Sequence, residues 1–91
     1  MPLTFAVKPG RWDSFQKVVG FAAADGEVAV ACAVSQEALE DLAHKVDMAP
    51  DDCVATFERH RPALERKAAA LYESGRVRAG ETVIIRASRI P

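Results

Sequence analysis

Two cysteines and two histidines are the side chains of this chain that could support nucleophilic chemistry. A catalytic thiol needs a neighbouring base to accept its proton, so Cys32 or Cys53 would have to lie beside His44 or His60. Cys53 falls in the first turns of an expected helix, whose positive end favours the thiolate, but the two aspartates directly before it oppose that effect. Cys32 is expected to face inward from a strand as a small apolar side chain. We therefore expect both cysteines to be structural and the chain not to be an enzyme.

A metal site would have to use His44, His60, Cys53 and Asp47. The spacing of these residues matches neither the paired-cysteine and HExxH patterns of zinc sites nor the loop of an EF-hand. Two histidines on different helices seldom converge on one ion without such a pattern. We expect no metal and no cofactor.

Arg61 is the charged residue whose position is most informative. Heptad spacing through Val54, Arg61 and Ala68 places it on the apolar stripe of an expected helix. A guanidinium there must be paired, because burying an unpaired charge costs several kcal/mol. Glu58 and Glu65, three and four residues away, are the natural partners. We favour an arginine stem packed at the sheet edge with its head bound by these carboxylates, and the alternative is an anion-binding site.

The last sixteen residues carry a net positive charge, whereas the rest of the chain carries a net negative charge. Residues 1–75 contain 8 basic and 12 acidic side chains, and the net charge of the chain is −1. The basic residues of the C-terminal segment are Arg76, Arg78, Arg86 and Arg89. Four arginines, with Trp12 and Tyr72 for base stacking, are few for a nucleic-acid binder. We favour a solvated edge strand, in which charge discourages aggregation, and do not favour nucleic-acid binding.

A β-hairpin is the element that the sequence defines best. Val18–Ala24 and Glu27–Val34 alternate in size around Asp25-Gly26, a pair typical of a type I′ turn. A two-residue loop at this pair would place Ala24 opposite Glu27. The larger apolar side chains then share one face, which we expect to pack against helices: Val19, Phe21, Ala23, Val28, Val30 and Cys32.

The opposite face of this hairpin carries only very small side chains at its centre. These residues are Gly20, Ala22, Ala29, Ala31 and Ala33. They fill a core layer poorly, and a contiguous apolar patch on a small protein usually marks an interaction surface. Symmetric homodimers are the commonest result of such contacts. The alternative is that the N-terminal strand or the C-terminal tail folds across this face.

The remaining elements surround the hairpin. A short strand is expected at Leu3–Val7, closed by Pro9-Gly10, and the segment 12–16 is either a helical turn or a bulged strand. Ser35 is expected to cap a helix that extends to about Val46. A longer helix is predicted over 51–74, starting near Pro50 and stopping at Gly75, with a kink or a division at Pro62. The last strand is predicted at about Thr82–Ala87.

This order of strand, strand, strand, helix, helix, strand predicts a single α+β domain over residues 1–91. The expected architecture has two layers, a small and mostly antiparallel sheet with two helices packed on one face.

Residues distributed along nearly the whole chain resemble the bacterial family called domain of unknown function 1488. They are Trp12-Asp13, Cys32 and Val34, Leu39-Glu40, Phe57-Glu58-x-x-Arg61, Leu64-Glu65, Ala68, Leu71, Gly80 and Val83. The resemblance implies a small α+β domain of this layout. It implies no activity and supplies no catalytic or ligand-binding residues.

Composition limits the class of function. The chain has 91 residues, of which 49% are hydrophobic and 27% charged, as in an ordinary soluble domain. No signal peptide and no membrane-spanning run is recognisable, so we expect a cytoplasmic protein with reduced thiols. A core of this size encloses no large pocket. We therefore expect a non-enzymatic protein–protein interaction module, and a homodimer is one version of it. The alternative is a weak binder of nucleic acid or anionic ligands through Arg61 and the C-terminal arginines.

Overall fold

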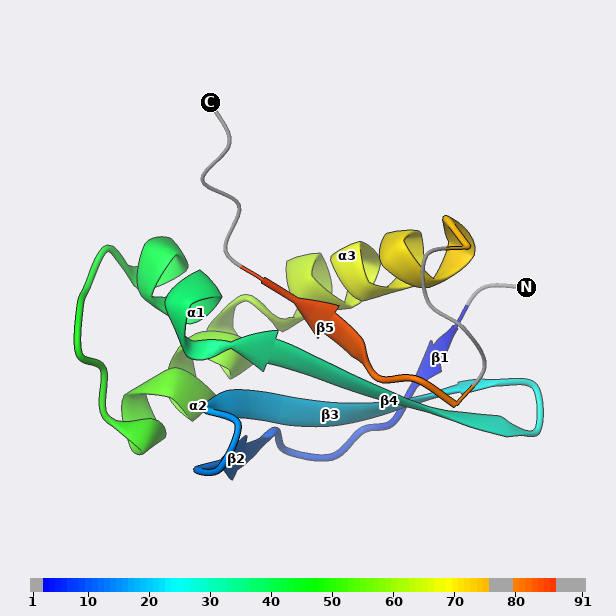
Figure 1. The fold of residues 1–91 in the computed structure, drawn as a ribbon, viewed down its shortest axis with the longest axis horizontal. Coiled ribbons are helices and arrows are strands. Elements are labelled where there is room, and N and C mark those ends of the chain that lie inside the picture. The colour runs from blue at the N-terminus through cyan, green and yellow to red at the C-terminus, as the bar shows by residue number, and fades with distance from the viewer. Residues whose placement is uncertain (1–2, 76–79, 87–91) are drawn as a thin grey trace.

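An antiparallel hairpin of β3 (Val18–Asp25) and β4 (Val28–Ser35) forms the centre of the sheet (Figure 1). The computed structural model describes residues 3–75 and 80–86. Asp25 pairs with Val28, so Gly26 and Glu27 form the loop, and the predicted pairing of Ala24 with Glu27 is wrong by two residues. Only Gly26 of the two has a positive φ, of 63°, as a type II′ turn requires at its first central position.

The two-residue shift leaves the division of the hairpin into faces unchanged, because side chains alternate with a period of two. Val19 pairs with Val34, and Phe21 pairs with Cys32; all four belong to the core. Val28 is an exception to the prediction, because it lies at the hairpin end and is 56% exposed.

Short strands complete the sheet on both sides of the hairpin. β1 (Thr4–Phe5) and β2 (Arg11–Asp13) pair antiparallel with opposite ends of β3. β5 (Val83–Ile85) pairs in parallel with β4. The sheet thus has five strands, one more than predicted, because the ambiguous segment 12–16 begins as a strand. It then turns where Asp13 Oδ1 accepts hydrogen bonds from the Phe15 and Gln16 amides.

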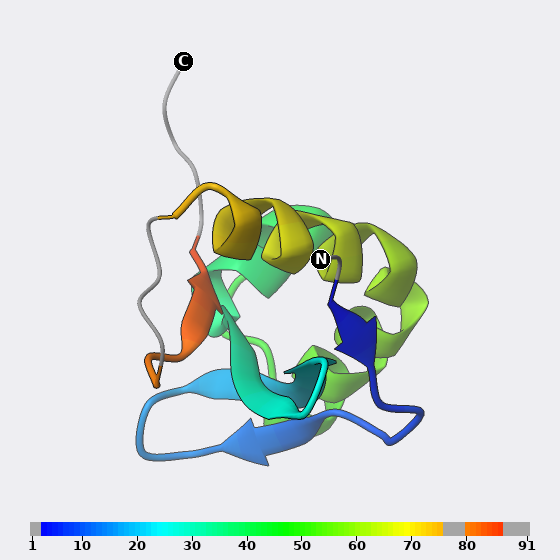
Figure 2. The same cartoon turned by 90° about the vertical axis from the view of Figure 1, so that its right-hand side faces the viewer.

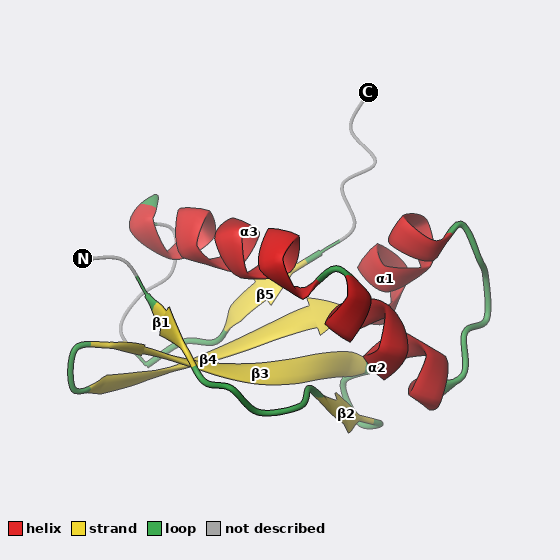
Figure 3. Cartoon of the chain, turned by 180° about the vertical axis from the view of Figure 1, so that it is seen from behind, coloured by secondary structure: helices red, strands yellow, loops and turns green. Residues whose placement is uncertain are grey.

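The described residues form three helices where two were predicted (Figure 3). Ser35 caps α1 (Gln36–Ala43), its Oγ accepting from the Ala38 amide at 3.1 Å. This helix ends before Val46, because His44 takes a left-handed conformation with φ 56°. The predicted long helix is divided at His60.

The division separates α2 (Pro50–Arg59) from α3 (Arg61–Glu73). Pro62 has no amide hydrogen to donate to the Glu58 carbonyl, and its ring would clash with that carbonyl in a continuous helix. It is instead tolerated in the first turn of α3. Gly75 ends α3 with φ 80°.

Helices cover one face of the sheet, and the core lies between the two layers, as predicted for an α+β domain (Figure 2). The sheet curves so that β1 and β5 rise toward α3. Phe57 of α2 is fully buried in the core, with its ring centroid 4.9 Å from that of Phe21 of β3. At the far end of α3, the Tyr72 hydroxyl donates to Asp25 Oδ2 at 2.8 Å and ties the helix to the hairpin end. This hydrogen bond raises the pKa of Tyr72. No helix in the described part of the chain is long and apolar enough to cross a bilayer.

Candidate functional site

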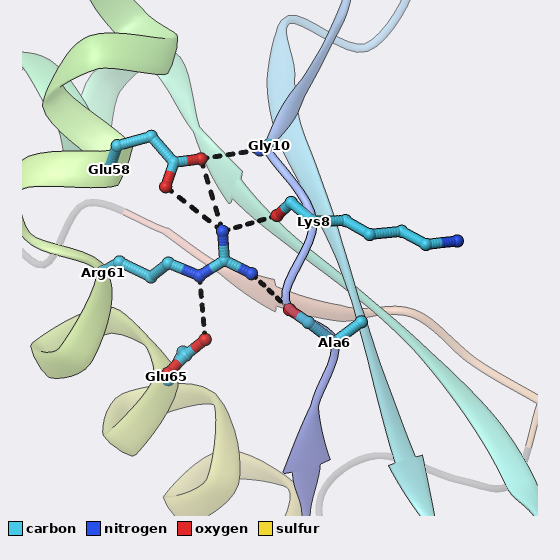
Figure 4. Close-up of polar contacts among 6 residues, drawn as sticks. All are labelled: Ala6, Lys8, Gly10, Glu58, Arg61 and Glu65. Carbon is cyan, nitrogen blue, oxygen red and sulfur yellow. Dashed lines mark hydrogen bonds and ion pairs between the residues drawn. The ribbon is translucent and has the colours of Figure 1, made fainter.

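The side chain of Arg61 extends from the first position of α3 toward the segment that joins β1 to β2 (Figure 4). Its Nε donates to Glu65 Oε2 at 2.9 Å, and Nη1 lies 3.2 Å from Glu58 Oε1. The structure therefore brings together the three residues that helical spacing placed side by side. The side chains of Arg61 and Glu65 are 16% and 24% exposed, so their ion pair is largely shielded from water, whereas Glu58 is 38% exposed.

Two backbone carbonyls complete the environment of the guanidinium. Nη1 donates to the carbonyl oxygen of Lys8 at 2.5 Å, and Nη2 donates to that of Ala6 at 2.6 Å. Glu58 extends the same network, because its Oε2 accepts from the Gly10 amide at 2.8 Å. Sequence reasoning missed these contacts, and no local pattern relates position 61 to residues more than fifty positions earlier.

This arrangement is suited to holding the chain together rather than to binding an external anion. Burial lowers the pKa of Arg61, but hydrogen bonds to Glu65 and Glu58 outweigh it, so the pKa is raised overall. The guanidinium carbon also lies 5.3 Å from the centroid of the Phe57 ring, within cation–π range. Because Nε and both Nη atoms already donate to protein oxygens, the fork is not open to a phosphate or carboxylate ligand. We interpret Arg61 as a clamp on the β1–β2 connection.

Both cysteines are buried in the core, and Cys53 is fully so. Burial, and secondarily the charge of Glu65, raises the pKa of Cys32 to about 11. Burial also raises the pKa of Cys53, with further contributions from Glu40 and Asp52. Neither thiol has a histidine among its hydrogen-bond partners within residues 3–75 and 80–86. In the same residues, no three histidine, cysteine or acidic side chains converge as metal ligands.

We expect native protein to react slowly with 5,5′-dithiobis(2-nitrobenzoate) near neutral pH, because both thiols are buried and protonated. The absorbance of released thionitrobenzoate measures the reaction. The same protein in guanidinium chloride is the control, and there both thiols should react at once. Rapid reaction of one thiol in the native protein would show an accessible thiolate and would revive a thiol-based activity.

The small residues of the hairpin lie on the sheet face that points away from the helices. We call this surface the outer face and define it by Gly20, Ala22, Ala24, Ala29, Ala31, Ala33 and Ile84. Ala22, Ala29 and Ala31 are exposed, and Gly20 is half-buried. Ala33 is only 4% exposed, so it contributes little accessible surface. It pairs with Gly20 on one side and with Ile84 on the other.

The N-terminal strand does not fold across the outer face. It pairs edge to edge with β3 through Thr4 and Phe5 and thus lies within the sheet. Arg11 borders the face, opposite Gly20. The C-terminal tail was the other predicted cover: its strand β5 pairs beside β4 within the sheet, and residues 76–79 and 87–91 lie outside the described residues.

Of the four C-terminal arginines, Arg86 lies within the described residues, and it is exposed directly after β5. Arg76, Arg78 and Arg89 lie outside the described residues. The two aromatic side chains proposed for stacking on bases are both engaged elsewhere. Trp12 packs against the core, and the half-buried Tyr72 binds Asp25.

Comparisons with known proteins identify a family and a fold. The family model described as "Protein of unknown function (DUF1488)" matches residues 3–85. A crystal structure of a DUF1488 protein of unknown function from Shewanella loihica PV-4 superposes with a TM-score of 0.79. It has 22% sequence identity, and the match covers 99% of this chain and 96% of that one. No curated protein is significantly similar to the chain.

Proposed function

The chain belongs to the DUF1488 family of proteins of unknown function, and from that premise we propose that it is a non-enzymatic cytoplasmic interaction module that binds a second copy of itself. The outer face is the surface through which the two copies meet. The observation that carries this proposal is the run of exposed alanines at the centre of that face, at positions 22, 29 and 31.

Alanine is an unusual choice for these positions. An antiparallel sheet with one face in water normally carries polar side chains on that face. Alanine is also depleted in strands, so these residues do not serve strand stability. A flat surface of methyl groups instead allows a second backbone to approach closely and excludes water between the two.

The composition of the outer face favours self-association over binding to a charged partner. Its centre has no charged side chain, and the adjoining strand β2 contributes Arg11 and Asp13 on the same side through their pairing with Gly20 and Val18. The edge thus carries one charge of each sign. In a dimer with a two-fold axis, each copy would bring one positive and one negative charge to the interface. Neither sign would be in excess there, as suits an isologous contact.

The size of the sheet limits the area of this contact. A strand residue covers about 16 Å², from a rise of about 3.4 Å and a strand spacing of about 4.8 Å. The five strands of the described chain contain 24 residues, so the whole sheet surface around the outer face covers roughly 400 Å² per copy, or roughly 800 Å² per dimer. Such an area lies at the weak, reversible end of protein interfaces, for which we expect a dissociation constant of roughly 10–100 μM.

Sedimentation equilibrium between about 5 and 500 μM protein, a range that brackets this constant, tests the proposal. The wild type should pass from monomer to dimer across this range. Ala31→Glu should weaken association about tenfold or more, because a carboxylate would be buried without a partner. Ala70→Glu is the matched control, since Ala70 is exposed on α3 at the opposite side of the molecule, and it should associate like the wild type.

Two results would contradict the proposal. One is a wild type that stays monomeric at every concentration. The other is an Ala31→Glu variant that dimerises as strongly as Ala70→Glu. Thermal melts of both variants establish that each is folded, so that a loss of association reports on the surface alone.

A further inference from the structure

A groove opens on the helical side of the molecule, where α1, the start of α3 and the end of β5 meet. Figure 1 shows α1 and α3 on either side of the end of β5. The cavity between them has a volume of about 270 Å³. That is the liquid volume of about nine water molecules, at about 30 Å³ each. It is enough for one small organic molecule.

The floor of this groove is apolar. It is formed by Ala38 and Leu42 of α1, Ala63 and Leu64 of α3, and Ile85 of β5. Leu42 is 38% exposed and is one of the large hydrophobic side chains that the described residues leave open to solvent. Such a floor offers burial to a hydrocarbon chain or ring but offers no hydrogen bond.

The rim of the groove is mainly basic. Lys67 stands one turn along α3 from Ala63, and Arg86 follows Ile85 at the end of β5. His60 adds an imidazole, and Asp41 is the single carboxylate. None of these four side chains has a hydrogen-bond or ion-pair partner in the described part of the chain, where both ion pairs belong to Arg61. Two cations that have no partner among residues 3–75 and 80–86 therefore border an apolar floor.

We propose that this groove binds a small carboxylate with an apolar tail, such as a medium-chain fatty acid. The tail lies on the floor between Leu42 and Ile85, and the carboxylate is bound by Lys67 and Arg86. Charge-assisted hydrogen bonds to a carboxylate are the strongest that these two side chains make. The apolar floor distinguishes this ligand from inorganic phosphate, which has no group to place there.

The groove is independent of self-association through the outer face. It lies on the helical side of the sheet, and none of its lining residues belongs to the outer face. A failure of either proposal therefore leaves the other standing.

Titration of ¹⁵N-labelled protein with octanoate, followed by amide chemical shifts, tests the inference. We expect saturable shifts at the amides of Ala63, Lys67 and Ile85. Octan-1-ol has the tail without the charge, and acetate has the charge without the tail. Both should bind about tenfold more weakly than octanoate, because each lacks one half of the recognition.

Variants of the protein test the cations and the apolar floor of the groove separately. The double substitution Lys67→Gln/Arg86→Gln should weaken octanoate binding about tenfold and leave octan-1-ol binding unchanged. Ala63→Phe, which fills the groove and keeps both charges, should abolish binding of both compounds. Arg66→Gln is the matched control, because Arg66 is exposed on the same helix but does not line the groove.

Several outcomes would overturn the inference. Octanoate and octan-1-ol binding with equal affinity would show that the cations do not recognise the carboxylate. Shifts that fail to saturate, or that map away from α1, α3 and β5, would show that the groove is not the site. Equal affinities of the double variant and of Arg66→Gln for octanoate would also show that Lys67 and Arg86 do not recognise the carboxylate.

Discussion

Replacement of Arg61 by alanine is expected to lower the free energy of unfolding by about 3 kcal/mol, a large fraction of the stability of a domain this size. The side chain donates to two carboxylates and two backbone carbonyls and lies over the Phe57 ring. Its loss leaves Glu58 and Glu65 facing each other without a cation. It also removes the link between α3 and the β1–β2 connection.

The magnitude follows from the exposure of the groups left behind. Breaking a fully buried ion pair costs about 3–5 kcal/mol, and the side chain of Arg61 is 16% exposed. That of Glu58 is 38% exposed, so water regains part of its hydrogen bonding. These exposures place the effect at the lower end of the range. With an m-value of about 1 kcal/mol/M, the urea midpoint should fall by roughly 3 M.

Two variants control this measurement. Arg66→Ala removes an exposed arginine from the same helix and should change stability by no more than about 0.5 kcal/mol. Arg61→Lys keeps the charge but lacks the planar fork needed to reach both carboxylates and both carbonyls, so an intermediate loss is expected. If Arg61→Ala were as stable as Arg66→Ala, the clamp would be refuted and an anion site at Arg61 would become the better interpretation.

Gly10→Ala should destabilise the protein by about 2–3 kcal/mol through overpacking. A Cβ at this position would lie 2.7 Å from Phe57 Cδ2 and 2.7 Å from Val19 Cγ1. Both of these side chains are fully buried and stiff, so neither can move aside at low cost. The expected measurement is a lower midpoint of urea unfolding with an unchanged slope.

Gly20→Ala is the matched control for this change. The nearest atoms to a Cβ at Gly20 are backbone oxygens 3.8 Å away, an ordinary contact distance. This variant should be as stable as the wild type or more so, because alanine reduces the entropy of the unfolded chain. Val19→Ala should cost less stability in the Gly10→Ala protein than in the wild type, because the new methyl group fills part of the space that the valine leaves. A Gly10→Ala protein as stable as Gly20→Ala would contradict the packing argument.

Local spacing predicted those features that depend on residues close together in the chain. The period of two assigned Val19, Phe21 and Cys32 to the core face, and this assignment survived a register error of two residues. Helical spacing placed Glu58 and Glu65 beside Arg61. Ser35 as a helix cap and the division at Pro62 followed from hydrogen bonds that one residue can or cannot make.

The turn itself was ambiguous in the sequence. Asp25-Gly26 fits the two central positions of a type I′ loop, while Gly26 alone fits the first central position of a type II′ loop. The structure adopts the second, with Asp25 paired to Val28. Both turns satisfy the local conformational preferences, so the choice depends on how the strands pair along their whole length.

By itself the sequence determined the α+β class, the two faces of the hairpin and the local partners of Arg61, because each depends on backbone periodicity or on contacts within one helical turn. Only the tertiary structure decided that Arg61 binds the carbonyls of Ala6 and Lys8, 55 and 53 residues away. It also decided that Gly10, which the sequence presents as a turn residue, is required by the Phe57 ring. Contacts between distant segments depend on how whole elements pack, and a periodic pattern carries no record of that packing.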